Sequence, residues 1–415
     1  MGHISKTPAG SYRANWRDWA GRQKAKTFKT RREAGAFLAD IESALNRGAY
    51  VDPYAGRTRF GTYAVRWLAA RNSQATTAAR DRSFMRTHVL PRWAAVPLGK
   101  VDHLAVQEWV TELSGRLAPA TVATCYQLTS AVFKAAVRDR LIGFNPCEGV
   151  SLPRIRRRDI SGQIVSPGEV TDRLLPVVPL RYRALVGLAA GTGLRWGECV
   201  GLRWDAVDLG EGKVRVVRVA VEVAGTVTSR PFPKSRAGNR SVPLPPFVSQ
   251  LLTVHREQYP PGSGGEIFTN IAGGPLRRTS FRKRVWRPAL VRAGMLGSVK
   301  ESSPETWRAT WLDASGLERN KEFTTERDAV ACVAAHASGG LHFHGLRHSY
   351  ATWLISSGVP VNDVQRVVGH EQASTTLNRY THGSSEQDAR VRKALADFSL
   401  TPGAPEGQED EGGPS

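Results

Sequence analysis

The chain has 415 residues, of which 41% are hydrophobic, so it can bury several cores and is expected to divide into about two to four domains. Its 58 Lys and Arg residues outnumber its 37 Asp and Glu residues and give a formal net charge of +21. This excess favours a polyanionic partner and is larger than solubility alone requires.

The cysteines and the lengths of the apolar runs argue against a disulfide-linked, zinc-binding, secreted or membrane protein. The four cysteines are scattered without a C-x-x-C pair, which argues against a disulfide framework and against a thiolate zinc site. The first residues lack an apolar signal-peptide core, and no apolar run approaches the length of a membrane span. We therefore expect a cytoplasmic protein with no membrane partner.

Residues 1–57 are predicted to form a small sheet with one packed helix. From residue 11 to residue 28, aromatic and basic residues alternate around the turn Ala20-Gly21, and residues 31–45 then show helical spacing after Thr30. A short cationic sheet can lie in a DNA groove, although a solvated charged face is the simpler alternative. The DNA-binding candidates in this segment are Arg13, Arg17, Arg22, Lys24 and Lys26.

Helical spacing dominates from residue 58 to residue 150 and predicts a helical bundle. One of its apolar faces is expected to contain Val101, Leu104, Val106 and Trp109. Residues 151–164 follow as an exposed basic linker that could run along a duplex backbone. The DNA-binding candidates in this linker are Arg156, Arg157 and Arg158.

The largest unit is predicted over residues 165–400 and contains a repeat of the N-terminal segment. The stretch that begins at Tyr12 aligns without gaps with the stretch that begins at Trp307, including a tryptophan and the turn glycine. This predicts a second copy of the module, inserted at residues 298–340. The first stretch has eight basic and two acidic residues and the second has four basic and five acidic, so the second copy need not bind DNA. Residues 401–415, rich in Pro, Gly and acidic residues, are expected to form a disordered tail.

An arginine motif stands near the start of the largest unit. The string GTGLRWGECVGLRWD places a glycine turn before Arg195 and puts Glu198 one helical turn further on. This long string resembles the first arginine box of the tyrosine recombinases and phage integrases.

A second motif, HGLRHSYAT, resembles the histidine-arginine box of the same family. His344 and Arg347 are three residues apart, so they share one face at the start of a helix. The neighbouring histidines His342 and His348 suggest a metal site as the competing interpretation. We disfavour it because Arg347 would repel a cation and no H-E-x-x-H pattern is present.

The resemblance implies a lysine on a hairpin between these two boxes. The β-branched run Val214 to Val223 is predicted to be a strand, and Lys234 then precedes an expected turn at residues 237–239. Lys234 fits the family's lysine. Arg236 and Arg240 lie nearby as alternatives.

The last motif residues lie towards the C-terminus. A helix over residues 361–368 is expected to end at Gly369 and His370, and Tyr380 follows in the polar string NRYTH. His370 could instead cap the helix, and Tyr380 could be a core aromatic. The segment resembles the nucleophile segment of the integrases, which makes Tyr380 the expected nucleophile.

Metal-free phosphodiester exchange explains why these residue types occur together. It needs a nucleophile, cations where charge develops on the phosphate and an acid for the leaving 5′ oxygen. Arg195 and Arg347 can fork onto the phosphate because a guanidinium is planar and bidentate. By resemblance, Lys234 is the general acid, His370 an added donor, and His344 an aid in removing the tyrosine proton. No cofactor or metal is implied.

The resemblance also implies a fold and partners. We expect a multidomain α and α+β protein: an arm-type module, a helical core-binding domain and a mixed α/β catalytic domain with the inserted copy. The implied function is that of a site-specific recombinase acting through a 3′-phosphotyrosyl intermediate in a bacterial host cell. The implied partners are double-stranded DNA with core and arm sites, three further protomers in a homo-tetramer, a directionality factor and a DNA-bending protein.

Several alternatives stay open at this stage. A chromosome-dimer or transposon recombinase would share the motifs, although such enzymes usually lack an arm-type first module. A type IB topoisomerase shares the mechanism but would not need that module. A DNA-binding regulator that kept the fold without the chemistry is the alternative from another class.

Overall fold

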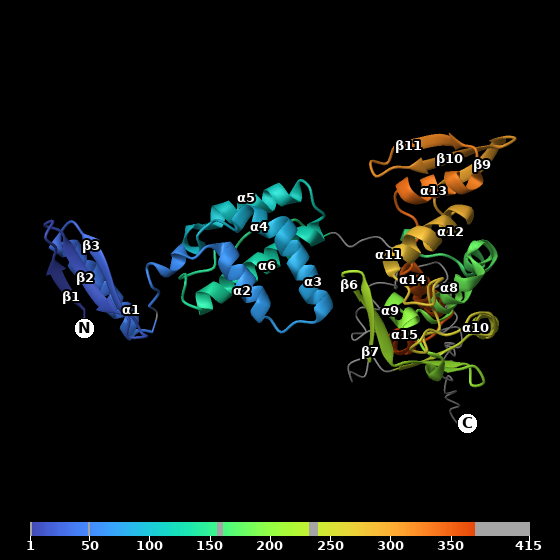
Figure 1. The fold of residues 1–415 in the computed structure, drawn as a ribbon, viewed down its shortest axis with the longest axis horizontal. Coiled ribbons are helices and arrows are strands. Elements are labelled where there is room, and N and C mark those ends of the chain that lie inside the picture. The colour runs from blue at the N-terminus through green and yellow to red at the C-terminus, as the bar shows by residue number, and fades with distance from the viewer. Residues whose placement is uncertain (1, 49, 156–160, 232–239, 370–415) are drawn as a thin grey trace, which may run out of the picture. The chain divides into compact units, whose positions relative to one another are not determined.

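The structure is a computed structural model that describes residues 2–48, 50–155, 161–231 and 240–369. Its contacts divide the chain into two units, Met1–Arg158 and Asp159–Ser415 (Figure 1). Among the described residues, no helix has both the length and the apolar character needed to span a membrane.

The first unit begins with a three-stranded antiparallel sheet in the order β1-β2-β3. Its elements are β1 (His3–Lys6), β2 (Tyr12–Arg17), β3 (Gln23–Phe28) and the covering helix α1 (Arg31–Asn46). Thr30 caps α1, because its hydroxyl accepts a hydrogen bond from the backbone N–H of Glu33. Trp16 is buried against α1, and its Nε1 donates to the Tyr50 hydroxyl at 2.8 Å. The predicted hairpin and helix are confirmed, whereas β1 was not predicted.

The rest of the first unit is helical, as predicted. It contains α2 (Phe60–Ala70), α3 (Ala75–Phe84), α4 (Leu90–Trp93), α5 (His103–Ser114) and α6 (Pro119–Arg138). Trp93 and Trp109 meet edge to face in its core. The expected apolar face of α5 was wrong at Leu104, which is 65% exposed. The buried stripe of α5 runs through Val106, Trp109, Val110 and Leu113, and Leu104 stands outside that spacing.

The helical part of the second unit is built around α8, whose residues from Ala184 to Thr192 are all buried. The helices are α7 (Leu175–Val177), α8 (Leu180–Thr192), α9 (Trp196–Val200), α10 (Pro246–Gln258), α11 (Arg278–Phe281), α12 (Arg287–Arg292), α13 (Glu326–His336), α14 (Gly345–Ser356) and α15 (Val361–Val368). Glycines let α10 approach α8 closely. A Cβ on Gly187 would lie 2.4 Å from Leu251 Cδ1, and one on Gly191 would lie 2.5 Å from Val248 Cγ2.

The strands between α9 and α10 correct one prediction. They are β4 (Val207–Asp208), β5 (Lys213–Val216), β6 (Arg218–Val223), β7 (Thr226–Pro231) and β8 (Arg240–Pro243). The run Val214 to Val223 was predicted to be one strand, but β5 pairs with β4 and β8 while β6 pairs with β7. The chain changes sheet at Val217, and β-branched residues favour a strand on both sides of that break.

Residues 298–336 repeat the arrangement of the N-terminal module. They form β9 (Ser298–Ser303), β10 (Thr306–Leu312), β11 (Glu318–Phe323) and α13. β10 is the central strand, as β2 is in the first sheet, and Trp307 stands opposite Phe323 as Tyr12 stands opposite Phe28. Figure 1 shows α13 between this sheet and α12.

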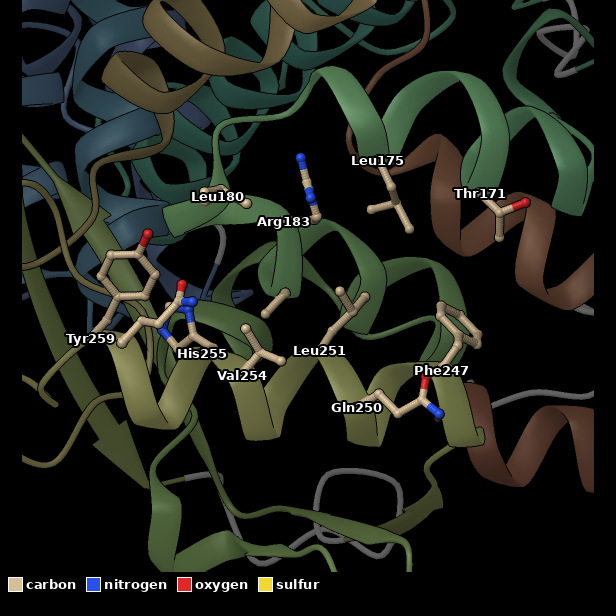
Figure 2. Close-up of a pocket in the computed structure, with 12 residues that line it drawn as sticks. Thr171, Leu175, Leu180, Arg183, Phe247, Gln250, Leu251, Val254, His255 and Tyr259 are labelled. Carbon is tan, nitrogen blue, oxygen red and sulfur yellow. The ribbon is translucent and has the colours of Figure 1, made fainter.

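A mostly apolar pocket of about 400 Å³ lies between α8 and α10. Figure 2 shows Leu251 and Val254 of α10, and Tyr259 just after it, facing Leu175 and Leu180. Of the motif residues that the structure describes, none lines this pocket.

Candidate active site

The turn before Arg195 depends on a glycine. Helix α8 ends at Thr192, and Gly193 follows with φ +62°, in the left-handed region. A Cβ on Gly193 would lie 2.5 Å from Tyr350 Cδ1 of α14. A side chain here would therefore be strained by the backbone and would collide with a buried ring. Gly193 turns the chain so that Arg195 stands immediately before α9, as the glycine turn predicts.

Helix α9 carries Arg195 and rests closely on strand β6. A Cβ on Gly197 would lie 2.5 Å from the carbonyl oxygen of Ala220, and one on Gly201 would lie 2.7 Å from the Ala220 nitrogen. The glycines of the motif therefore allow the helix to touch the strand backbone. This packing fixes the start of α9, where Arg195 is located.

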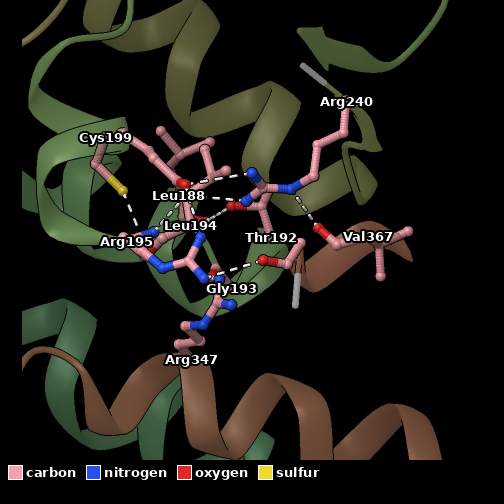
Figure 3. Close-up of polar contacts among 11 residues, drawn as sticks. Leu188, Thr192, Gly193, Leu194, Arg195, Cys199, Arg240, Arg347 and Val367 are labelled. Atoms are coloured by element: carbon pink, nitrogen blue, oxygen red, sulfur yellow. Dashed lines mark hydrogen bonds and ion pairs between the residues drawn. The ribbon is translucent and has the colours of Figure 1, made fainter. Parts of the chain in front are cut away.

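Glu198 accepts hydrogen bonds from two of the arginines labelled in Figure 3, Arg195 and Arg240. Its carboxylate accepts the Arg195 backbone N–H at 2.8 Å and Arg195 Nη1 at 2.9 Å. It also accepts Arg240 Nη1 at 3.2 Å and Arg240 Nη2 at 2.9 Å. The Glu198 side chain is 0% exposed, while the Arg195 side chain keeps 41% exposure. The buried Glu198 carboxylate thus holds the partly exposed Arg195 guanidinium in place.

The ionisation of Glu198 depends on these arginines. Burial alone would raise the pKa of its carboxyl, but the hydrogen bonds and charge of Arg240, together with Arg195, hold that pKa below its usual value. Glu198 is therefore an anion near neutral pH. Arg195 completes its own contacts by donating from Nη2 to the carbonyl oxygen of Gly369 at 3.0 Å.

Arg347 reaches the same turn from helix α14. It is buried, and its Nη1 donates to the carbonyl oxygen of Gly193 at 2.8 Å (Figure 3). His344 lies immediately before α14 and is exposed. The two motifs, which are far apart in the sequence, therefore meet at one turn. The predicted placement of His344 and Arg347 at a helix start is confirmed.

An aromatic cluster supports the start of α14. The Phe343 ring contacts Trp196 of α9, with centroids 5.1 Å apart, and Trp286, with centroids 5.4 Å apart. Trp286 Nε1 also donates to the carbonyl oxygen of Leu341 at 2.7 Å. The segment that leads to His344 is therefore fixed to the helix that follows Arg195.

The end of the predicted linker also contacts this region. Gln163 Oε1 accepts the backbone N–H of His342 at 2.7 Å. The Val165 N–H donates to the Ser349 hydroxyl at 3.0 Å, and Trp353 Nε1 donates to the Val165 carbonyl at 2.8 Å. Residues 163–165 are thus bound to α14 and to the segment just before it.

Three of the expected catalytic residues, Lys234, His370 and Tyr380, lie outside the described residues, as does Arg236. Their roles stay predictions. Arg240, one of the alternatives to Lys234, is 4% exposed and paired with Glu198, so it is a buried ion-pair partner and not a substitute acid. Among the described residues, no three His, Cys, Asp or Glu side chains are grouped as metal ligands.

The role of Arg240 in this cluster was not recognised from the sequence. A signal was present: in β8, Arg240 alternates with Ser241 and shares the inward face with Val242. An arginine in the buried register of a strand indicates a buried ion pair, because an uncompensated charge there is costly.

Two of the DNA-binding candidates lie on the helix side of the first sheet. Lys24 and Lys26 share a face with Trp16, which packs on α1. Lys24 Nζ pairs with Asp52 at 2.5 Å, and Lys26 Nζ lies 4.7 Å from the Phe37 ring centroid. These two lysines therefore do not extend the open face of the sheet.

Arg13 and Arg17 alternate with the buried Ala14 and Trp16 and are exposed on the opposite face, on either side of the buried Asn15. Arg22 lies in the turn and pairs with Asp18 at 2.9 Å. Arg156, Arg157 and Arg158 lie outside the described residues. The structure thus brings together Arg13 and Arg17 and separates them from the two lysines.

The inserted sheet differs from the first sheet at the positions of these two arginines. Arg308 stands where the first copy has Arg13, but it pairs at 2.9 Å with Glu322, which replaces Thr27. Leu312 stands where the first copy has Arg17. The face is therefore neutralised by a cross-strand pair and carries an exposed apolar residue.

The sequence is similar to those of known recombinases over most of its length. The sequence model of the phage integrase family matches residues 173–387, which include both arginine motifs. A protein described as a prophage phiRv2 integrase of Mycobacterium tuberculosis is 27% identical over 407 residues, covering 95% of each chain. A tyrosine recombinase XerC-like protein of Caldanaerobacter subterraneus is 24% identical over 404 residues, covering 92% of this chain and 94% of that protein.

Solved structures show the same fold. The Tn1549 transposon integrase, in complex with transposon right end DNA, matches with a TM-score of 0.60 at 19% identity, over 82% of this chain and 100% of that one. The family match covers more than half of the 415 residues, because residues 173–387 number about 215. The chain therefore belongs to the phage integrase family of tyrosine recombinases and is an enzyme that cleaves and rejoins DNA.

Proposed function

We propose that this recombinase integrates a mobile element into DNA and excises it again, through a 3′-phosphotyrosyl intermediate formed by Tyr380. The observation that carries the proposal is the convergence of Arg195 and Arg347 on the turn at Gly193. Arg195 is held by the buried Glu198 carboxylate and Arg347 by the Gly193 carbonyl, and together they provide the fixed positive charge that a phosphate requires in the transition state.

The proposed roles follow the chemistry of the exchange. The Tyr380 oxygen attacks the scissile phosphorus, and His344 helps to take up its proton. The P–O bond to the 5′ oxygen breaks, and Lys234 supplies that oxygen with a proton. Arg195, Arg347 and His370 stabilise the phosphate oxygens. In the rejoining step, a 5′ hydroxyl attacks the phosphotyrosine and releases Tyr380, so no external energy source is needed.

We further propose a division of labour between the parts of the chain. Residues 1–57 bind arm sites, residues 58–150 and 165–400 hold the core site, and residues 151–164 link them along the duplex. By family resemblance, four protomers assemble on two core sites, with a directionality factor and a DNA-bending protein as accessory partners. The exposed Arg13 and Arg17 support the arm-binding role.

A trapping experiment tests the chemistry. Purified full-length protein and a Tyr380→Phe variant are incubated with nicked DNA that carries a candidate attachment site, without added metal. We expect a denaturant-resistant adduct linked to the 3′ phosphate with the wild type alone. If the wild type forms none on DNA that it binds, the regulator interpretation replaces the recombinase.

The choice of DNA sites separates an integrase from the other recombinases. Chromosome-dimer resolution and transposition are the second candidates, because the chain is also similar to an XerC-like recombinase and to a transposon integrase. An integrase should recombine two unlike sites, of which one carries arm sequences. Efficient exchange between two identical core sites, with no effect of arm DNA, would favour a resolvase.

A further inference from the structure

Arg240 is a buried charge that the proposed chemistry does not use. It is the first residue of β8, opposite Val216 of β5, and its side chain is 4% exposed. Its Nη1 and Nη2 donate to the two oxygens of Glu198, and its Nε donates to the carbonyl oxygen of Val367 at 2.8 Å. One guanidinium therefore joins three elements: β8, α9 and α15 (Figure 3).

Packing alone does not explain this pair. Burying two charges costs desolvation, and an apolar pair of similar volume often stabilises a core equally well. The geometry of the pair instead restricts Glu198, because both carboxylate oxygens are held by Arg240 and both also accept from Arg195. Any rotation of the carboxylate would break bonds to both arginines at once.

The position of Arg240 in the chain adds a second connection. It follows the segment that contains Lys234, and its partner Val367 precedes His370 by three residues. Arg195 donates to the carbonyl oxygen of Gly369 in the same stretch. Arg240 and Arg195 thus both donate to backbone carbonyls at the end of α15, close in sequence to His370.

We propose that Arg240 is a positioning residue for strand cleavage: it fixes the Glu198 carboxylate, and through it the orientation of Arg195, and ties β8 to the end of α15. The inference rests on the proposed recombinase function. Because its side chain is 4% exposed and paired with Glu198, Arg240 acts through its neighbours and not on the DNA itself. Its contribution is to keep the phosphate-binding guanidinium in one orientation, since small displacements of catalytic groups lower rates strongly.

The test uses full-length protein on nicked DNA under single-turnover conditions, with enough protein to saturate the site. The variants are Arg240→Gln, Arg240→Lys and the apolar pair Arg240→Met with Glu198→Leu. Arg215→Gln on the adjacent strand β5 is the matched control, because Arg215 is exposed and donates only to the Asp205 carbonyl among the described residues. Thermal unfolding and DNA affinity are measured on every variant.

We expect Arg240→Gln to cleave on the order of 10²-fold more slowly than the wild type at equal DNA affinity. Arg240→Lys should recover part of the rate, because it restores the charge but not the fork. The apolar pair should regain thermal stability without regaining the rate. A purely structural role predicts the opposite, namely that the apolar pair recovers both.

The pH dependence of the cleavage rate is a further measurement, and a simple loss of stability would not change it. Arg195 at the start of α9 and Arg240 of β8 contact Glu198, and Arg347 and Tyr350 of α14 contact the Gly193 turn. Four further charged residues line a small cavity beside Glu198: Arg203, Asp205, Arg215 and Arg218. Without the Arg240 charge, burial dominates and the Glu198 pKa rises. The acid limb of the cleavage rate should therefore move to higher pH in Arg240→Gln.

Two outcomes separate the inference from the function on which it rests. If the wild type forms no adduct, both the proposed function and this inference are rejected. If the wild type forms the adduct and Arg240→Gln matches its rate and pH profile, the positioning role is overturned while the function stands.

Discussion

The Nη1 atom of Arg347 donates to the carbonyl oxygen of Gly193 at 2.8 Å, so the second arginine motif supports the turn that presents the first. The turn needs glycine because its φ is +62° and Tyr350 fills the space beside it. The two arginines therefore form one structural unit, and a change at the turn should affect both.

Gly193→Ala should destabilise the second unit and slow cleavage. The left-handed backbone alone costs about 1–3 kcal/mol for a residue with a Cβ, and the collision with Tyr350 adds to it. Thermal unfolding and single-turnover cleavage measure the two effects. Gly210→Ala is the control, because its Cβ would make an ordinary 3.5 Å contact with Asp208. Equal behaviour of the two variants would contradict the assigned role of the turn.

Replacing Arg13 and Arg17 with Ala should weaken arm-site binding and flatten its salt dependence. Each lost phosphate contact lowers the slope of log K against log salt by about 0.9, so the double variant should lose about 1.8. The measurement is a titration of arm DNA at several salt concentrations. Lys26→Met should change the slope little, because Lys26 lies over Phe37 on the helix side.

The inserted copy supplies a matched control for that titration. Arg308 occupies the position of Arg13 but is paired with Glu322. Arg308→Ala should leave arm binding and its salt dependence unchanged. Equal losses from Arg13→Ala and Arg308→Ala would mean that both sheets bind DNA.

The stability of the second unit should depend on pH through Glu198. Its folded-state pKa is below the ordinary value of 4.5, so its ionisation contributes stability that is complete above that value. This contribution is lost as the pH falls through the lower folded-state pKa. Between pH 5 and pH 3, the unfolding temperature of the wild type should therefore fall more steeply than that of Glu198→Gln. Parallel curves would show that Glu198 titrates alike in both states.

Arg287→Met should loosen the inserted module. Arg287 is buried in α12 and donates to the carbonyl oxygens of Ala334, Ala337 and Gly339 at the end of α13. Losing these bonds leaves buried carbonyls without their donor and should cost on the order of 3 kcal/mol. Faster limited proteolysis near residue 338 would report the loosening.

A second arginine of α12 controls for the loss of charge. Arg292 pairs with Glu326 of α13 at 3.7 Å, and both side chains are exposed. Exposed pairs contribute about 0–1 kcal/mol, so Arg292→Met should leave the proteolysis rate nearly unchanged. If both variants behave alike, the buried contacts of Arg287 do not hold the module.

The local signals in the sequence predicted the elements that carry the motifs. The glycine turn before Arg195 and the helix start at His344 were predicted correctly, because glycine, apolar spacing and capping act over a few residues. The helix after Thr30 was predicted for the same reason. The convergence of the two motifs followed only from the family resemblance.

The features that could not be predicted from the sequence depend on contacts between residues that are distant in the chain. The break at Val217 separates two sheets whose partners lie on β8 and β7, and no local pattern marks such a choice. The strand β1 is short, and its residues pair only because β2 offers an edge. The pair between Arg240 and Glu198 joins positions 42 residues apart, so neither residue alone indicates it.

The inserted module leaves the catalytic chain and returns to it at almost the same point. A Cβ on Gly340, where the module ends, would lie 3.0 Å from Leu296, just before it begins. The two ends of the module therefore lie next to each other in the fold. This position suits the insertion of a domain, because a folded unit can be gained, lost or exchanged there without changing the order of the elements that carry Arg195 and Arg347.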